Sequence, residues 1–222
     1  MKICGLTREE EVRWVMEEKA DYLGMVLFFP KSKRNISIEQ AKRLLAICQE
    51  QGKPGEDGLI PCTVAVTVSP TPEQVRQIEQ AGFAMIQIHG ELSAETYEAV
   101  TLPIIRAVQA GDVEEHVHRS DGGSVDTDRK KISGEKIVAW LYDAHAPGSG
   151  KAFDWNMLQK IPRDDKLLFL AGGLNSENVR EAIAKVNPDV VDVSSGVEID
   201  AETVGKDRNK IKEFVRKVEK DE

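Results

Sequence analysis

The sequence contains few of the features that mark a membrane-spanning or a disulfide-stabilised protein. No apolar run approaches the ~20 residues that a membrane-spanning helix needs, and no basic segment followed by an apolar one opens the chain as an export signal would. Cysteine is scarce, and the odd number of 3 (Cys4, Cys48 and Cys62) argues against a disulfide framework. These absences predict a cytoplasmic protein that has free thiols and no membrane partner.

Positive charge is scarce relative to negative charge. The 30 Lys and Arg residues are outnumbered by 38 Asp and Glu residues, so the formal net charge is -8. This charge would repel a polyanion, so we expect no nucleic-acid partner, and any bound anion must occupy a local pocket. Hydrophobic residues make up 41% and charged residues 31% of the chain, a balance typical of a globular protein.

The chain does contain a regular alternation of strand-like and helix-like segments. Short apolar runs bounded by turn residues predict strands over residues 2–4, 21–28, 61–68, 85–88, 103–108, 137–142, 167–170 and 190–193. Strands that alternate with helices to a count of about eight predict an α/β fold, a single (β/α)8 TIM barrel with parallel strands. The 222 residues, taken as one domain over 1–222, are close to the roughly 250 typical of such a barrel.

The starts of the predicted helices are marked by residues that cap a first turn. Thr7 with Glu10 predicts a capping box for a helix that runs to about residue 19. Further helices are predicted after the N-caps Ser37, Thr71 and Ser93, and an amphipathic segment at 207–220 predicts the last one. The alternation weakens at 111–135, which we interpret as a polar, solvent-facing insert.

Two Gly/Ser turns follow neighbouring predicted strands near the end of the chain. Gly172 and Gly173 follow one apolar run, and Ser194, Ser195 and Gly196 follow the next. Glycine lets the backbone approach a ligand closely, and N–H groups at the start of a following helix can cradle an anion. An isolated Gly pair often only ends a strand. Two such turns at adjacent strand ends predict a phosphate site, which this kind of barrel builds after its last two strands.

The first strand carries a candidate base. Because side chains alternate along a strand, Lys2 and Cys4 share one face and Ile3 points the other way. If that face lines the barrel, the Lys2 ammonium should favour the Cys4 thiolate and lower the pKa of the thiol. By the same alternation Asp192 faces inward on the last strand, where we expect it to pair with Lys2. The alternative is that Cys4 is a small buried hydrophobe.

Four more polar side chains lie at or beyond predicted strand ends. Arg34 closes a basic turn and could clamp a carboxylate bidentately, although such turns are usually just solvated. Gln87 and His89 share the inward face of the fourth strand, although a lone His is more often structural. Asp154 follows a flexible loop and could be an acid in a water-free site or simply an N-cap. No spaced His, Asp or Cys cluster indicates a metal site.

Taken together, the motifs resemble one enzyme family. In chain order they are KICGLT (2–7), GMVLFFPKSKRNIS (24–37), IQIHG (86–90), GSGKAFDW (148–155), LAGGLNSENV (170–179) and VDVSSGVE (191–198). Only KICG and the GKxFDW pattern are specific singly, but the ordered set spans the chain. It is similar to phosphoribosylanthranilate isomerase, a (β/α)8 enzyme of tryptophan biosynthesis.

The resemblance implies an Amadori rearrangement of N-(5'-phosphoribosyl)anthranilate to 1-(2-carboxyphenylamino)-1-deoxyribulose 5-phosphate, without cofactor or metal. It implies that Asp154 is the general acid that protonates the furanose ring oxygen. Cys4 would be the general base that takes the proton from C2'. The two Gly/Ser turns would hold the phosphate and Arg34 the anthranilate carboxylate. We expect further substrate contacts from Gln87, His89 and Asp192.

The chain departs from the family pattern at Pro147, at the polar stretch 111–135, at the loop 51–59 and at extra residues 199–204. None of these removes a catalytic motif, although Pro147 would stiffen the loop that carries Asp154. Two other functions stay open, because barrels host many reactions. One is an epimerase or isomerase of another sugar phosphate, and the other is a catalytically silent phosphate-binding barrel. In each case we expect a small phosphorylated ligand and a monomer or homodimer.

Overall fold

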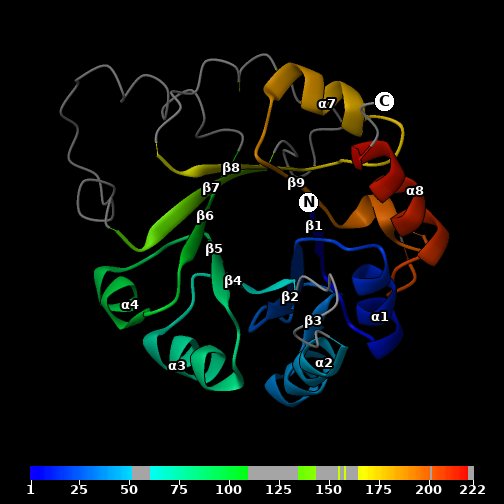
Figure 1. Ribbon diagram of the computed structural model, residues 1–222. Coiled ribbons are helices and arrows are strands. Elements are labelled where there is room, and N and C mark those ends of the chain that lie inside the picture. The colour runs from blue at the N-terminus through cyan, green and yellow to red at the C-terminus, as the bar shows by residue number, and fades with distance from the viewer. Residues whose placement is uncertain are drawn as a thin grey trace.

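The computed structural model describes residues 1–51, 61–109, 135–143, 155, 158, 165–200 and 202–219. Within them, eight parallel strands close into a barrel with helices around it (Figure 1). The barrel strands are β1 (Lys2–Cys4), β2 (Tyr22–Leu27), β4 (Cys62–Val68), β5 (Met85–His89), β6 (Ile104–Gln109), β7 (Ile137–Asp143), β8 (Leu167–Ala171) and β9 (Val190–Val193). The predicted (β/α)8 barrel is therefore confirmed.

The barrel closes between the first and the last strand of the chain. β1 pairs with β2 on one side and with β9 on the other, and the remaining strands follow in chain order. In this register Lys2 lies opposite Asp192. The two-residue β3 (Asn35–Ile36) pairs with the end of β2. Because the barrel strands are parallel, their carboxyl ends share one rim.

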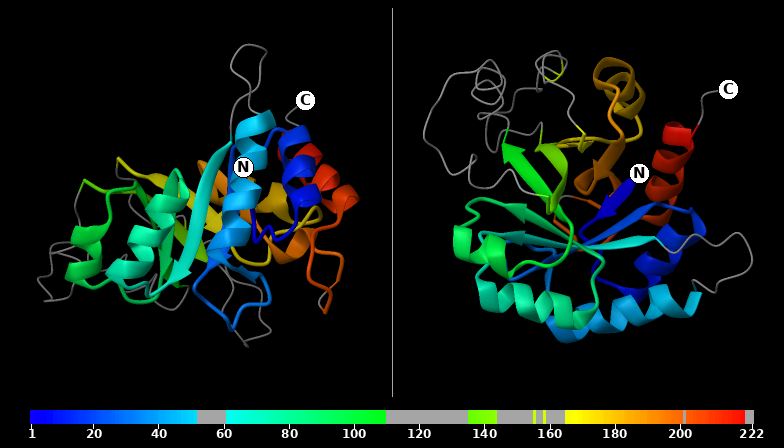
Figure 2. Two further views of the ribbon diagram at one scale, coloured as in Figure 1. Left: turned by 90° about the horizontal axis from the view of Figure 1, so that it is seen from below. Right: turned by 60° about the vertical axis from the view of Figure 1, so that its left-hand side comes forward.

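Helices cover the outside of the barrel, as the further views show (Figure 2). Those described are α1 (Glu9–Glu17), α2 (Ile38–Gln51), α3 (Pro72–Ala81), α4 (Ala94–Ala99), α7 (Val179–Val186) and α8 (Arg208–Glu219). All but the six-residue α4, in which only Thr96 is buried, bury an apolar stripe, as α3 does with Val75 and Ile78 and α8 with Ile211 and Phe214. Burying a side chain of this size contributes about 1.5–3 kcal/mol. Within the described part of the chain, no helix has the length and apolar character to cross a membrane.

Three predicted N-caps are confirmed and one capping box is wrong. The hydroxyls of Ser37, Thr71 and Ser93 each accept a hydrogen bond from the backbone N–H three residues further on. At α1 the predicted partner Glu10 is wrong. The Glu11 carboxylate instead accepts the backbone N–H groups of Thr7 at 2.6 Å and Arg8 at 3.1 Å. Because α1 begins only at Glu9, Glu11 is the acid that turns back toward the helix start and is buried there.

The interior of the barrel is filled by alternate side chains of its strands. Val64, Val66, Leu141 and Phe169 are buried in one apolar cluster. Tyr22 packs against the ring of Phe169 edge-on, with the ring centroids 5.2 Å apart. The same alternation brings polar side chains inward near the carboxyl rim, so the strands that stabilise the core also position the site.

Some predictions fall outside the described residues. They are the insert at 111–135 apart from its last residue, the loop at 51–59 apart from its first residue, Pro147, and Asp154 with most of the short helix at 154–158.

Candidate active site

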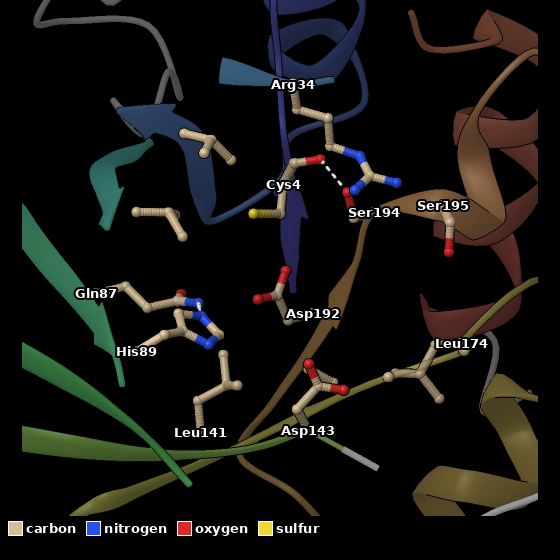
Figure 3. Close-up of a pocket in the computed structure, with 15 residues that line it drawn as sticks. Cys4, Arg34, Gln87, His89, Leu141, Asp143, Leu174, Asp192, Ser194 and Ser195 are labelled. Atoms are coloured by element: carbon tan, nitrogen blue, oxygen red, sulfur yellow. Dashed lines mark hydrogen bonds between the residues drawn. The ribbon is translucent and has the colours of Figure 1, made fainter. Parts of the chain in front are cut away.

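The carboxyl rim of the barrel holds a pocket of about 440 Å³. Its polar side chains come from the ends of four strands, β1, β5, β7 and β9, and from the segment after β2 (Figure 3). Most of the residues predicted for the site line this pocket: Cys4, Arg34, Gln87, His89, Gly172, Gly173, Asp192, Ser194 and Ser195. Gly196 follows in the same turn, and Asp154 lies outside the described residues. The structure thus brings the predicted residues together, while their roles stay predictions.

A buried ion pair lies at the base of the pocket. Lys2 Nζ donates a 2.6 Å hydrogen bond to Asp192 Oδ2, and the Lys2 side chain is fully buried. Burial alone would lower the pKa of Lys2, but the attraction of Asp192 and Cys4 outweighs it and raises the pKa above its ordinary value. Lys2 therefore stays protonated. The pairing follows from the alternation and the barrel closure that the sequence predicts.

The Cys4 thiol does not have the lowered pKa that the sequence predicts. Burial raises its pKa above the ordinary value, and the negative charge of Asp192 adds to this, although the cation of Lys2 opposes both. The prediction is wrong because it counted the neighbouring charge of Lys2 and neglected desolvation, which is the larger effect for a side chain that is only 8% exposed. Near neutral pH the protonated thiol is the stable form.

Glycine on β2 makes room for the ion pair and the thiol. A Cβ atom on Gly24 would lie 2.8 Å from Cys4 Sγ, closer than real Cβ atoms come, and 3.2 Å from Lys2 Cε, which is tighter than most real contacts. The Gly24 carbonyl also accepts the backbone N–H groups of Gly5 and Leu6, which turns the chain away just after Cys4. The site therefore depends on the absence of a side chain at Gly24.

His89 and Gln87 form a neutral pair on β5. Their Nε2 atoms are 2.7 Å apart, and because an amide nitrogen can only donate, His89 Nε2 accepts and Nδ1 carries the proton. Burial lowers the pKa of His89 to about 4, and the cations of Lys2 and Arg106 add to the effect. Among the described residues, Gln87 Oε1 and Asp192 Oδ1 are buried without a hydrogen-bond partner. Two buried acceptors that line one pocket suit a ligand rich in hydroxyl groups.

The two Gly/Ser turns lie side by side after β8 and β9. Gly172 and Gly173 have φ values of +91° and +66°, a conformation that glycine adopts at little cost. Gly196 packs so closely that a Cβ atom there would collide with the carbonyl oxygen of Leu174 in the neighbouring turn. Ser194 Oγ donates to the Cys4 carbonyl at 3.0 Å. Ser195 opens a three-residue 3-10 helix, whereas α7 begins only at Val179, so the predicted anion site depends on the glycine and serine turns themselves.

The basic turn after β2 is not simply solvated. Arg34 Nε donates to Glu198 Oε1, and Lys33 Nζ lies 2.9 Å from Glu198 Oε2. Gly5, with φ +79°, lies under the arginine, since a Cβ atom there would be 2.5 Å from Arg34 Cδ. The guanidinium thus stands beside Ser194 at the mouth of the pocket (Figure 3).

Two residues of the site were missed in the sequence. Asp143 ends β7 and lines the pocket, on the same inward face as Leu141. The alternation of that strand continues through Asp143, although the apolar run predicts a strand only to residue 142. Lys206 is the second, a 2% exposed side chain that reaches Ser194 and Glu198. No sequence pattern marks it.

Two described residues, Trp155 and Leu158, lie close to Asp154 in the sequence. Trp155 is half-buried, with Lys185 Nζ 5.7 Å from its ring centroid, and Leu158 is buried in the core. Elsewhere in the described ranges, no group of three or more His, Cys, Asp or Glu side chains has a geometry that would hold a metal ion.

Comparison with known proteins gives one consistent result. The model of the family described as N-(5'phosphoribosyl)anthranilate (PRA) isomerase matches residues 1–217. The N-(5'-phosphoribosyl)anthranilate isomerase of Streptococcus mutans is 37% identical over 221 residues, 99% of this chain and 98% of that protein.

Solved structures agree. The phosphoribosyl anthranilate isomerase of Thermotoga maritima superposes with a TM-score of 0.74 at 34% identity, covering 97% of this chain and 96% of that one. A second such isomerase, in complex with reduced 1-(o-carboxyphenylamino)-1-deoxyribulose 5-phosphate, has a TM-score of 0.70 at 31% identity over the same shares.

Proposed function

We propose that this chain, which belongs to the N-(5'-phosphoribosyl)anthranilate isomerase family, catalyses the Amadori rearrangement of N-(5'-phosphoribosyl)anthranilate in tryptophan biosynthesis. The product would be 1-(2-carboxyphenylamino)-1-deoxyribulose 5-phosphate. The observation that carries the proposal is that a thiol and a carboxylate, Cys4 and Asp143, line one pocket together with an arginine and two glycine turns. A substrate with a phosphate at one end, an aromatic carboxylate at the other and a sugar between them matches this arrangement.

The two anionic ends of the substrate would set its orientation. The phosphate would lie on the turns at Gly172–Gly173 and Ser194–Gly196, where backbone N–H groups and small side chains converge. The carboxylate would meet the Arg34 guanidinium, whose two terminal nitrogens suit a bidentate contact. The buried acceptors Gln87 Oε1 and Asp192 Oδ1 would then receive sugar hydroxyls. Substrate binding would thereby satisfy polar atoms that otherwise carry a desolvation cost.

Cys4 is proposed as the general base that takes the proton from C2'. Burial raises the pKa of this thiol, so the thiolate needs a nearby cation, and the ammonium of Lys2 supplies it. A thiolate formed in such a water-poor site is a stronger base than one in water, because the same desolvation that opposes its formation favours its reprotonation. The thiol would return this proton to C1' as the enolamine tautomerises to the ketone, while the C2' hydroxyl gives up its own proton.

The general acid has two candidates. The sequence motif points to Asp154, which lies outside the described residues, whereas Asp143 lines the pocket at the end of β7. We propose Asp143 as the group that protonates the furanose ring oxygen and opens the sugar to a Schiff base. It enters the pocket from a rigid strand on the far side of Asp192 from Cys4, which suits proton transfer at a second substrate atom. Asp154 stays the alternative.

One kinetic experiment tests the function and chooses between the two acids. Turnover of freshly generated N-(5'-phosphoribosyl)anthranilate is followed by its fluorescence for the wild type and for Cys4→Ala, Asp143→Asn and Asp154→Asn. We expect kcat to fall by at least the ~100-fold typical of losing a general acid or base in Cys4→Ala and Asp143→Asn, and by much less in Asp154→Asn. A large loss confined to Asp154→Asn would assign the acid to that residue instead. A folded wild type without turnover would overturn the function itself.

The remaining expectations follow from the same family membership. We expect no cofactor, and indifference of the turnover to a chelator would exclude a metal-dependent sugar-phosphate epimerase on the same barrel. We also expect a cytoplasmic location, a small phosphorylated substrate as the only partner class, and a monomer or homodimer. Sedimentation equilibrium of the purified chain would decide the oligomeric state.

A further inference from the structure

Lys206 is a buried cation that the proposed reaction does not use. It follows β9 by way of a loop and is held in place by an antiparallel bridge between Lys206 and Glu198. Its ammonium donates to the Ser194 carbonyl at 3.0 Å, to Ser194 Oγ at 3.3 Å and to Glu198 Oε1 at 3.4 Å. Three acceptors use the three donors of a protonated lysine.

A buried ammonium is costly, so its retention calls for a physical reason. Burial lowers the pKa of Lys206, and the carboxylate of Glu198 offsets this only in part. An apolar side chain at this position would avoid that cost. The physical reason must therefore lie in the two residues that the Lys206 ammonium binds, Ser194 and Glu198.

Glu198 is shared by three cations. Arg34 and Lys33 bind it from the side of the pocket mouth, and Lys206 binds it from the interior. Burial alone would raise the pKa of Glu198, but the hydrogen bonds of Arg34 and Lys33 and the charge of Lys206 outweigh it and hold the pKa below its ordinary value. Arg34 is thus fixed through Nε by a carboxylate that Lys206 also binds.

Lys206 also joins two parts of the site that bind opposite ends of the proposed substrate. On one side it holds Ser194, in the turn proposed for the phosphate. On the other side it holds Glu198, which fixes the guanidinium proposed for the carboxylate. Apart from the backbone between residues 194 and 198, this is a direct link between the two anion-binding elements.

We propose that Lys206 is a positioning residue that sets the separation between the phosphate-binding turn and Arg34, and so selects substrates with two anionic ends. This rests on the proposed function, because that function assigns the two ends. Lys206 is not placed to touch the reacting atoms. The charge of Lys206 also opposes the rise in the pKa of Cys4, so a small change in kcat accompanies the larger change in binding.

The first test is a split between KM and kcat. Lys206→Met should raise KM for N-(5'-phosphoribosyl)anthranilate by about tenfold, the loss expected for one charge-assisted contact, and change kcat by less than about threefold. The matched control is Lys210→Met, which removes an exposed ammonium that donates to the carbonyls of Glu198 and Ile199. A KM in Lys206→Met equal to that of Lys210→Met would overturn the proposal.

A double-mutant cycle separates positioning from a general structural role. If Lys206 acts partly through Arg34, then Lys206→Met should lower kcat/KM about tenfold in the wild type but only about threefold in an Arg34→Ala background. Equal losses in both backgrounds would mean that Lys206 only stabilises the fold. If Lys206→Met does not fold, Lys206→Gln replaces it, because the amide NH2 group can still donate to Ser194. It should show the same non-additivity with a smaller loss, and additive losses would again overturn the proposal.

The same assay distinguishes the two levels of inference. A folded wild type without turnover refutes the proposed function. Turnover that depends on Arg34 but is indifferent to Lys206 refutes only the positioning role.

Discussion

The two ends of the barrel interior use the same strands for different purposes. Toward the amino ends the inward side chains are apolar, with Phe169 packed against Tyr22 and Val190 beside them. Nearer the carboxyl ends the same alternation turns Cys4, His89 and Asp192 inward, and Lys2, at the start of β1, pairs with Asp192. The first end gains stability from burial, whereas the second carries desolvated charges whose net contribution to stability is small or negative. The comparison teaches that stability and chemistry can be assigned to different layers of one barrel.

The largest effect should come from breaking the ion pair at the polar end. Lys2→Met leaves Asp192 buried without its partner, so we expect the free energy of unfolding to fall by about 3–5 kcal/mol. Turnover should fall as well, since the Cys4 thiolate loses its stabilising cation. Urea unfolding and the kinetic assay measure the two effects.

The double variant Lys2→Met with Asp192→Leu sharpens this result. Removing both charges should recover most of the lost stability, because no unpaired charge remains, but it should not recover turnover. If the double variant stayed as unstable as Lys2→Met, the ion pair itself would be contributing to stability. The division between a stabilising apolar layer and a functional polar layer would then be wrong.

At the apolar end, a cavity should cost stability and leave the chemistry intact. Phe169→Ala removes a fully buried ring, which typically costs about 3–5 kcal/mol in the free energy of unfolding. Under conditions where the variant is folded, we expect kcat and KM within about twofold of the wild type. A kcat loss as large as that of Cys4→Ala, with the circular dichroism spectrum unchanged, would show that the two layers are not separable.

A smaller effect should appear as a dependence of stability on pH. The pKa of His89 is about 4 in the folded protein, below the ~6.5 of an unfolded chain, so unfolding takes up a proton between these values. Stability from this group is therefore present above pH 6.5 and is lost as the pH falls toward 4.

Over the interval from pH 7 to pH 5 the His89 contribution amounts to about 2 kcal/mol. Other groups titrate in this range too, so the measurement is a difference between two proteins. Urea unfolding of wild type and His89→Asn at both pH values should show the wild type losing more stability on acidification. Parallel losses in the two proteins would mean that the His89 pKa is not lowered.

The sequence predicted best the features that depend on the pattern of a single strand or turn. Apolar runs located the strands, and alternation with barrel closure paired Lys2 with Asp192 across the chain. The sequence also predicted the two Gly/Ser turns, and in the structure Gly196 packs closely against the neighbouring turn. These features depend on short-range patterns and on the topology that such patterns imply.

The sequence was least informative where the outcome depends on several elements at once. The raised pKa of Cys4 depends on how completely the whole barrel excludes water from it. Lys206 meets Glu198 only because a loop folds back into an antiparallel bridge. Asp143 was missed for a smaller reason, since the end of β7 was placed one residue too early.

The hydrogen bond between Lys2 and Asp192 spans 190 positions of the sequence. When the first two thirds of the chain have left the ribosome, the helices and strands on one side of Cys4 have therefore been synthesised. Asp192, the partner of Lys2 on the other side, has not. Contacts this distant in sequence form late, because a long loop must close before they can be made. The site should thus appear all at once, when the final strand arrives, and a nascent or truncated chain without β9 should have no fraction of the activity.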